Sequence, residues 1–480
     1  MSTSDYPDLQ LYVDGSWRTA DDELPVVDPA TEEVIGRVPV AGSGDLDDAV
    51  NAAVRGFEAW RLTPPSDRAE VICRAAGLMR ERQEEIARSI TLEHGKPLVE
   101  ARAEVVRGAE FFEWDAGEAV RTYGRVIPSG PGVRITVHHQ PIGPVAAFSP
   151  WNFPFSQPAR KVAGALASGC SIVLKAAEET PAGALHLARA FHDAGLPPGA
   201  LNLVFGVPDE ISRRLIADEA IRLVAFTGST SVGRHLTGLA SDHMTPVMME
   251  LGGHAPVIVC EDTDVDAAAA ASAVRAMRNA GQVCTSPTRF YVHQDVHERF
   301  LDGMTRRTEE LVVGNGLAEG VDMGPVANDR RLATVSDLVA DAVAVGGRLT
   351  TGGNRVGSKG YFLEPTILAD VPDEARIMRE EPFGPVAVVN PVASLEEAVD
   401  RANSVPYGLA SYGFTNRADY AERLVDGVEA GNLSINTLEA SLPETPFGGV
   451  KSSGYGREGG TEGLLHYLVV KNVIHRSKIG

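Results

Sequence analysis

The sequence predicts an α/β protein whose parallel sheets are covered by helices. Short apolar runs alternate with helical stretches in the second quarter of the chain. These runs are 143–148, 171–175, 201–205 and 221–226. A second series of the same kind begins at 255–260 and continues to about residue 437. Strands that alternate with helices favour parallel pairing, because each helix returns the chain across one face of the sheet.

The chain before these series begins with a strand and continues with helices. A strand is expected at 9–13, just before an Asp-Gly turn. Apolar residues at helical spacing predict one helix from Asp45 and another over 98–120. Asp67 and Glu70 predict an N-terminal capping pair for a helix between these two.

A segment of different composition separates these helices from the first series of strands. Residues 123–140 are rich in Gly and Pro and contain an alternating run at 133–138. This pattern predicts a β-hairpin that stands off the main body. A strand-like run at 467–474 is expected near the C-terminus.

Length and composition limit the class of protein. The 480 residues suit two or three domains. There are 44 basic and 65 acidic residues, and the resulting net charge of −21 argues against nucleic acid or an anionic membrane as the main partner. Without a signal-peptide pattern or a long apolar run, we expect a cytoplasmic protein.

The four cysteines show no metal-ligand spacing, so no metal site is expected. Cys73, Cys170 and Cys260 are expected to be buried core thiols. Cys284 differs, because it follows a helical stretch in a Gly-Gln turn with small polar neighbours. This placement favours an accessible sulfur, which a nucleophile needs.

Two further residues are candidates for catalysis. Glu250 stands between an apolar run and Gly252-Gly253, where a raised pKa would suit a general base; a turn or capping glutamate is the alternative. Asn152 follows the apolar run 143–148, at the strand end where open sheets bind ligands. Its amide could donate to a developing oxyanion, or it could be an ordinary residue of a proline-bracketed turn.

Two segments suggest a nucleotide site. Gly228, Ser229 and Gly233 lie where a strand passes into a helix, so backbone N–H groups there could receive a pyrophosphate. Lys175 and Glu178 directly follow another strand and could bind a ribose, or form an exposed charge pair. The formal G-x-G-x-x-G at 454–459 is rejected as a nucleotide site, because no strand precedes it.

Together and in this order, these motifs resemble the aldehyde dehydrogenase superfamily, as do Glu381-Pro-Phe383-Gly-Pro and the segment 446–454. The resemblance covers about residues 9–473. It implies a Rossmann-like cofactor domain, an α/β catalytic domain and a β-hairpin oligomerisation element. The implied limits are 1–122 with 142–252 for the NAD(P)-binding domain, 253–437 for the catalytic domain, and 123–141 with 460–480 for the oligomerisation element. A homodimer or homotetramer is expected.

The resemblance also implies the chemistry. A Cys284 thiolate attacks the aldehyde carbon, the Asn152 amide holds the oxyanion, and Glu250 activates the water that hydrolyses the thioester to a carboxylate. The implied cofactor contacts are Trp151, Lys175, Glu178, Gly228, Ser229, Gly233, Glu381 and Phe383. A carboxylate at Glu178 favours NAD+ over NADP+, because it would accept from a ribose hydroxyl and repel a phosphate.

The substrate prediction rests on four side chains, Gln157, Arg160, Arg278 and Ser441. They resemble the carboxylate-binding residues of succinate-semialdehyde and 2-oxoglutarate-semialdehyde dehydrogenases, so a short semialdehyde acid is expected. The alternative is a broad-specificity enzyme for neutral aliphatic or aromatic aldehydes, in which the arginines are merely helix-surface residues. A cysteine hydrolase is disfavoured, because no histidine base is apparent. A non-catalytic protein of this fold would be expected to have lost Cys284, Glu250 or Asn152.

Overall fold

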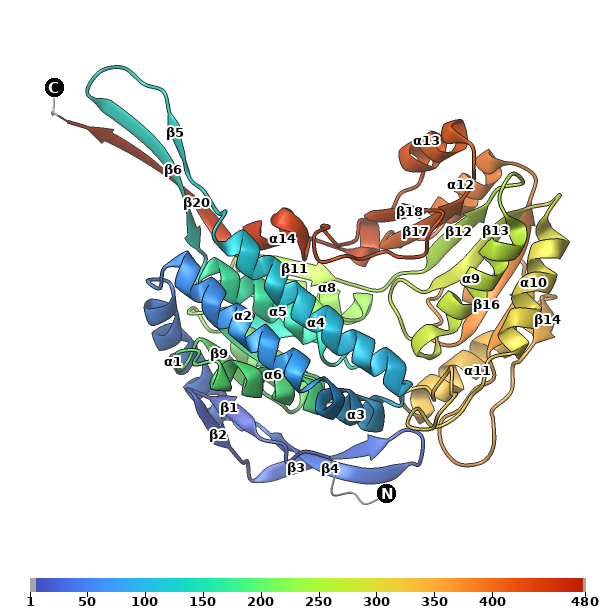
Figure 1. Cartoon of the computed structure of the whole chain (residues 1–480), viewed down its shortest axis with the longest axis horizontal. Helices are drawn as coiled ribbons and strands as arrows, with labels where there is room; N and C mark the ends of the chain where they lie inside the picture. Colours follow the sequence, from blue (N-terminus) through green and yellow to red (C-terminus); the bar gives the residue numbers. More distant parts are fainter. Residues whose placement is uncertain (1–5, 478–480) are drawn as a thin grey trace.

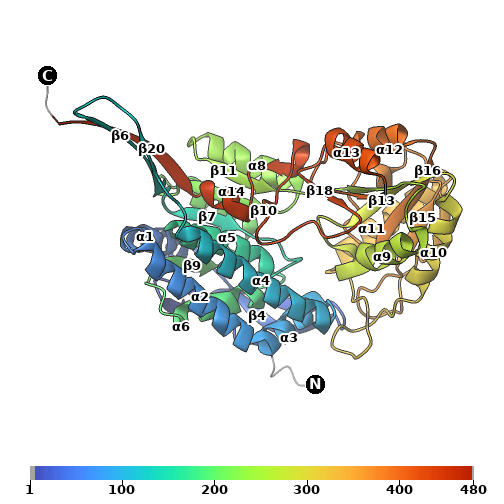
Figure 2. The same cartoon turned by 45° about the horizontal axis from the view of Figure 1, so that its top comes forward.

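The computed structural model describes residues 6–477. Two large β-sheets, each covered by helices, lie side by side, and a three-stranded sheet projects from the first of them (Figure 1). Figure 2 shows the same projection from a second direction. No helix in this part of the chain is long and apolar enough to cross a membrane.

The first sheet has eight strands in the order β19-β11-β10-β7-β8-β9-β1-β2. Its five central strands are parallel, as the alternating pattern predicts. They are β7 (Val145–Phe148), β8 (Ile172–Lys175), β9 (Leu201–Val204), β10 (Leu223–Thr227) and β11 (Val247–Glu250). Antiparallel strands complete the two edges: β1 (Leu11–Val13), β2 (Ser16–Arg18) and β19 (Gly454–Tyr455).

Helices cover both faces of this sheet (Figure 1). They are α1 (Ser43–Trp60), α2 (Pro65–Glu81), α3 (Gln83–His94), α4 (Leu98–Ala119), α5 (Ser156–Ser168), α6 (Ala182–Asp193), α7 (Pro208–Ile216), α8 (Thr230–Ser241) and the short α14 (Gly460–Leu465). The predicted capping pair is wrong: α2 begins at Pro65 without a side-chain cap. Proline suits the first helical position because its missing N–H would have no partner there.

The second sheet has seven strands in the order β14-β15-β16-β13-β12-β17-β18. They are β12 (Ala255–Val259), β13 (Pro287–His293), β14 (Arg348–Thr351), β15 (Thr366–Ala369), β16 (Val386–Val392), β17 (Ala410–Phe414) and β18 (Asn432–Ile435). All pair in parallel except the edge strand β14. The helices of this half are α9 (Val265–Met277), α10 (His297–Glu309), α11 (Asp329–Ala344), α12 (Leu395–Asn403) and α13 (Ala418–Gly427).

The predicted hairpin is present as β5 (Arg125–Ile127) and β6 (Val133–Pro141). The C-terminal strand β20 (Leu468–Arg476) pairs with β6 along its whole length. A second ribbon, β3 (Asp22–Asp28) with β4 (Glu33–Val40), was not predicted. Its sequence alternates poorly between apolar and polar residues, so periodicity gave no signal there.

Two separate apolar cores underlie the two large sheets. One gathers buried residues between Leu9 and Leu251, together with Leu464 and Tyr467; the other lies between Ala255 and Leu438. The domain limits given above, 1–122 with 142–252, 253–437, and 123–141 with 460–480, are kept as a proposal. Residues 1–5 and 478–480 of that division lie outside the described residues.

A matched pair of glycines tests the packing of the first core. A Cβ on Gly56 of α1 would lie 2.1 Å from the backbone carbon of Gly199, whereas a Cβ on Gly77 of α2 would meet nothing within 4 Å. We expect Gly56→Ala to destabilise the protein by about 1–3 kcal/mol through overpacking. Gly77→Ala should instead stabilise it by about 0.5–1 kcal/mol, because alanine loses less entropy in a helix. Urea unfolding measures both, and equal midpoints would contradict this account of the packing.

Candidate active site

Two cavities meet at Cys284. One, of about 580 Å³, lies beside Trp151, Gly228 and Glu381. The other, of about 170 Å³, lies beside Arg160 and Arg278. Cys284 and Gln157 line both cavities, so the thiol stands at their junction.

The sheet explains why these residues meet. Asn152 follows β7, Gly228 follows β10 and Glu250 ends β11, and these three strands are parallel neighbours. Their carboxyl ends therefore lie at one edge of the sheet, where open α/β sheets bind ligands.

An unusual backbone turn brings Cys284 to this edge. After α9, Asn279 (φ 54°), Ala280 (φ 51°) and Gly281 (φ 67°) adopt three successive left-handed conformations. A Cβ on Gly281 would lie 1.9 Å from the carbonyl oxygen of Gly384, so only glycine fits there. Left-handed conformations at non-glycine residues are strained and persist only where surrounding contacts enforce them.

The environment of Cys284 favours the neutral thiol. Burial, followed by the charges of Glu381 and Glu250, raises the pKa of this thiol to about 12, and Arg160 acts in the opposite direction. Attack on a carbonyl needs the thiolate, so a neighbouring base has to take the proton.

Glu250 is buried at the end of β11, and neither of its carboxylate oxygens has a hydrogen-bond partner among residues 6–477. Burial holds its pKa well above the usual value, and Glu458 raises it further, while Lys161 and Arg160 act in the opposite direction. An unpartnered carboxylate with a raised pKa, in the same cavity as the half-buried thiol of Cys284, has the properties of a general base.

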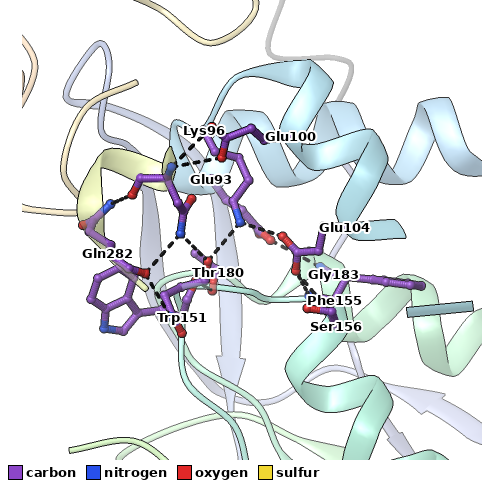
Figure 3. A network of polar contacts seen from close by, with 12 residues as sticks. Glu93, Lys96, Glu100, Glu104, Trp151, Phe155, Ser156, Thr180, Gly183 and Gln282 are labelled. Atoms are coloured by element: carbon purple, nitrogen blue, oxygen red, sulfur yellow. Dashed lines mark hydrogen bonds and ion pairs between the residues drawn. The ribbon is translucent and has the colours of Figure 1, made fainter. Parts of the chain in front are cut away.

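Asn152 is held from both ends. Its side-chain Nδ2 donates to the backbone carbonyl of Gln282 over 3.0 Å. Its backbone carbonyl accepts from Lys96 Nζ over 2.9 Å and from Asn279 Nδ2 over 3.0 Å. Lys96 and Gln282 are labelled in Figure 3. A side-chain amide carries two N–H hydrogens, so one remains for an oxyanion near Cys284.

The larger cavity has groups that suit a dinucleotide. Helix α8 starts at its edge, with Ser229 as the N-cap, and Ser229, Ser231 and Arg234 line the wall. A helix N-terminus and a guanidinium both favour a pyrophosphate. Five of the predicted cofactor residues line this cavity: Trp151, Gly228, Ser229, Glu381 and Phe383.

Glu381 is oriented by the backbone. Its Oε1 accepts from Gly253 N over 3.2 Å, and burial raises its pKa to about 8. Arg331 also lines the cavity and lowers the pKa of Glu381; it was not predicted. No sequence signal marks Arg331, because it lies in an ordinary helix 50 residues before Glu381.

Three predicted cofactor residues do not line this cavity. Lys175 and Glu178 form an ion pair with each other at the end of β8. A Cβ on Gly233 would lie 2.4 Å from the side chain of Leu251, so this glycine lets α8 pack closely on that residue. Their roles toward a cofactor stay predictions.

The smaller cavity brings together all four predicted substrate residues, Gln157, Arg160, Arg278 and Ser441. Arg160 is 8% exposed, its Nη2 donates to Ser441 Oγ, and its Nη1 has no partner in the described chain. The guanidinium lies 4.0 Å from the ring centre of Phe111 and 5.0 Å from that of Phe447. Arg160 is therefore not a helix-surface residue.

Four further charged residues line this cavity and were not predicted: Glu104, Arg107, Arg275 and Glu439. Arg275 lies one helical turn before Arg278, and this spacing could have indicated it. Arg107 lies on α4, far from the motifs in sequence, and carries no such signal.

Two other sequence predictions can be compared with the structure. Cys170 and Cys260 are buried as expected, but Cys73 is exposed on α2, so its prediction was wrong. Within the rejected segment 454–459, Gly454 pairs with Glu250 of β11. A Cβ on Gly454 would lie 1.9 Å from the carbonyl oxygen of Met249, so this glycine serves close backbone packing. In residues 6–477, no three His, Cys, Asp or Glu side chains are grouped to hold a metal ion.

A half-buried thiol between a dinucleotide-sized cavity and a cation-lined one is what a cysteine-dependent dehydrogenase requires. The chain belongs to the aldehyde dehydrogenase family, whose family model matches residues 17–473. The protein is therefore an aldehyde dehydrogenase.

Individual relatives cover nearly the whole chain. A 4-(hydroxymethyl)benzenesulfonate dehydrogenase of Comamonas testosteroni is 47% identical, covering 98% of this chain and 99% of its own. A succinate-semialdehyde dehydrogenase (NADP(+)) of Escherichia coli is 39% identical over 96% of both chains. The NAD+ complex of an aldehyde dehydrogenase from Bacillus cereus superposes with a TM-score of 0.96 at 34% identity, covering 98% of this chain and 97% of that one. The cofactor is a nicotinamide dinucleotide, NAD(P)+.

Proposed function

We propose that this aldehyde dehydrogenase oxidises a short semialdehyde acid, such as succinate semialdehyde or 2-oxoglutarate semialdehyde, to the corresponding diacid. One observation carries the proposal: Arg160 lines the cavity that ends at Cys284 and is buried there, and its Nη1 has no hydrogen-bond partner among the described residues. A buried guanidinium nitrogen left unpaired is costly, and an anionic group on the substrate would satisfy it. Arg278 in the same cavity supplies a second cation.

The roles of the side chains follow from their positions. Glu250 takes the thiol proton, and Cys284 Sγ adds to the aldehyde carbon. The second N–H of Asn152 stabilises the resulting oxyanion. NAD(P)+ held beside Trp151, Ser229 and Glu381 in the larger cavity would serve as the hydride acceptor, and the carbon bound to Cys284 would then be at the oxidation level of a thioester. Glu250 releases the thiol proton to solvent and then takes a proton from the water that adds to the thioester. It passes this proton to the departing sulfur of Cys284, which frees the carboxylic acid and restores the thiol.

Two of the relatives support an anionic substrate. One is named for a benzenesulfonate and the other for succinate semialdehyde, and both compounds carry an acid group. Planar guanidinium groups bind carboxylates and sulfonates through paired N–H donors.

A second candidate is a broad-specificity enzyme for neutral aliphatic or aromatic aldehydes. The rings of Phe111, Phe153 and Phe447 also line the smaller cavity and would suit an apolar body. In that case the arginines would serve the packing of these rings, to which Arg160 and Arg278 lie close.

The cofactor preference and the assembly are also proposals. NAD+ is preferred over NADP+ through the carboxylate of Glu178. A homodimer or homotetramer forms through the projecting sheet, whose strands β5 and β20 carry exposed apolar residues. These are Val126, Ile127, Val469, Val470 and Ile474. An exposed apolar face with an open edge strand is typical of an interface.

Replacing Arg160 tests the substrate proposal. We expect Arg160→Ala to lower kcat/KM for succinate semialdehyde. The activation free energy should rise by about 2–5 kcal/mol, which is the cost of removing one partner of a buried charged contact. Activity with butanal and benzaldehyde should change little. NADH formation at 340 nm measures all three. Arg68→Ala is the matched control, because Arg68 is also buried but lines neither cavity. Equal losses with acidic and neutral aldehydes would favour the second candidate.

Replacing Glu250 tests the hydrolysis step. Glu250→Gln should lower steady-state turnover by about 10²–10⁴-fold, the usual contribution of a general base. About one NADH per active site should still form in a burst, slower than in the wild type because Glu250 no longer takes the thiol proton, and the thioester should then accumulate. Because burial raises the pKa of Glu250, its carboxylate form becomes populated only at pH values well above those at which a glutamate usually ionises. The wild-type hydrolysis rate should therefore rise with pH. The variant should lose this rise, and a variant that keeps the wild-type profile would exclude Glu250 as the base.

Replacing Glu178 tests the cofactor proposal. Glu178→Gln removes the charge that repels a 2′-phosphate, so the ratio of kcat/KM for NAD+ to that for NADP+ should fall by about tenfold, near 1.4 kcal/mol. Glu179→Gln is the neighbouring control and should leave the ratio unchanged. A wild-type enzyme with a lower KM for NADP+ than for NAD+ would overturn the proposal directly.

A further inference from the structure

The linker between α3 and α4 places a buried cation behind the active site. Lys96 is 1% exposed, and its Nζ donates to Glu104 Oε2 over 2.6 Å and to the carbonyl of Asn152 over 2.9 Å. The same ammonium lies 4.2 Å from the ring centre of Phe153. A buried ammonium needs strong partners, and here one of the two is the backbone of the proposed oxyanion-binding residue.

The partner of Lys96 holds the next part of the same segment. Glu104 Oε1 accepts from the backbone N–H groups of Phe155 over 2.9 Å and Ser156 over 3.1 Å, at the start of α5. The Lys96–Glu104 pair therefore fixes the chain on both sides of Pro154, with Asn152 at one end. Figure 3 shows Lys96 and Glu104 together with Phe155 and Ser156.

A second set of contacts ties Asn152 to the cysteine loop. Asn279 Nδ2 donates to the carbonyls of Asn152 over 3.0 Å and Gln282 over 3.2 Å, and Asn152 Nδ2 donates to that same Gln282 carbonyl. Glu100 of α4 accepts from the left-handed Asn279 N–H with both oxygens, over 3.0 and 3.3 Å. Gln282 lies two residues before Cys284, so these hydrogen bonds connect the Asn152 segment with the cysteine loop.

We propose that Lys96 is a positioning residue for the Asn152 amide, and that Glu100, acting through Asn279, positions the cysteine loop against it. The α3–α4 hairpin then sets the distance between the oxyanion donor and Cys284. The inference rests on the proposed role of Asn152. Oxyanion donors act only within a narrow range of distance, so a small rotation of the 152 peptide would weaken catalysis without changing which groups are present.

A purely structural ion pair is the rival explanation, because buried pairs often stabilise nothing beyond their own charges. The two explanations differ in coupling. A residue that acts through Asn152 has no effect on turnover once the Asn152 amide is gone, whereas independent effects add.

The experiment is a double-mutant cycle between Lys96→Met and Asn152→Ala. In the wild-type background, Lys96→Met should lower kcat by at least about tenfold while KM for aldehyde and for NAD+ stays within about threefold. In the Asn152→Ala background, Lys96→Met should produce no further loss. Because Lys96→Met leaves the Glu104 carboxylate unpaired, the cycle is repeated with Lys96→Met/Glu104→Gln, whose amide oxygen still accepts from Phe155 and Ser156.

A second cycle uses Asn279→Gly, which removes the Nδ2 donor at a left-handed position that glycine readily adopts. It should also lower kcat in the wild-type background and have no effect in the Asn152→Ala background. Glu93→Gln is the matched control, since Glu93 on α3 accepts from Ala182 and Gly183 but does not contact Asn152. Its effect, whatever the size, should add to that of Asn152→Ala.

The outcomes separate the two proposals. Additive effects in both cycles would overturn the positioning role while leaving the role of Asn152 intact. If Asn152→Ala alone keeps wild-type kcat, the proposed role of Asn152 fails, and the inference fails with it. Should Lys96→Met not fold, as judged by circular dichroism, the Asn279 cycle decides the question by itself.

Discussion

The left-handed run at 279–281 is the constraint on which the rest of the site depends. This run follows the end of α9 and changes the direction of the chain, so that Cys284 lies at the junction of the two cavities. Gly281 makes the reversal possible by its contact with the backbone of Gly384, and Glu100 holds the Asn279 N–H. A strained loop keeps one conformation only if its neighbours enforce it, and here those neighbours come from both large sheets and from α4.

Burial then sets the chemistry of the reactive groups. The thiol of Cys284 and the carboxylates of Glu250 and Glu381 all have raised pKa values, and burial is the main cause in each case. The same lack of water that raises these pKa values also strengthens electrostatic interactions with Arg160. The site thus raises the pKa of both the nucleophile and the base, and places cations where an anionic substrate can bring the compensating charge.

The sequence predicted what local pattern controls. The parallel strands, the hairpin and the C-terminal strand follow from apolar periodicity, and the motif residues Cys284, Glu250 and Asn152 follow from their places at strand and helix ends. Arg107 and Arg331 were not predicted, since each reaches its cavity from a helix that carries no motif. The β3–β4 ribbon was missed for a related reason, because tertiary contacts rather than alternation determine it.

The hairpin of α3 and α4 shows most clearly that sequence patterns do not predict contacts made by distant parts of the chain. Lys96, Glu100 and Glu104 follow one another at intervals of four residues, which in sequence is typical of an exposed, salt-bridged helix face. Instead Lys96 and Glu104 are buried, and all three carry backbone contacts of the catalytic segments. Charges at this spacing become buried only when another part of the chain supplies partners, and those partners are the carbonyl and N–H groups that the loops at 152–156 and 279 leave free of regular secondary structure. The irregular backbone of the active site and the buried charges of the hairpin therefore require each other.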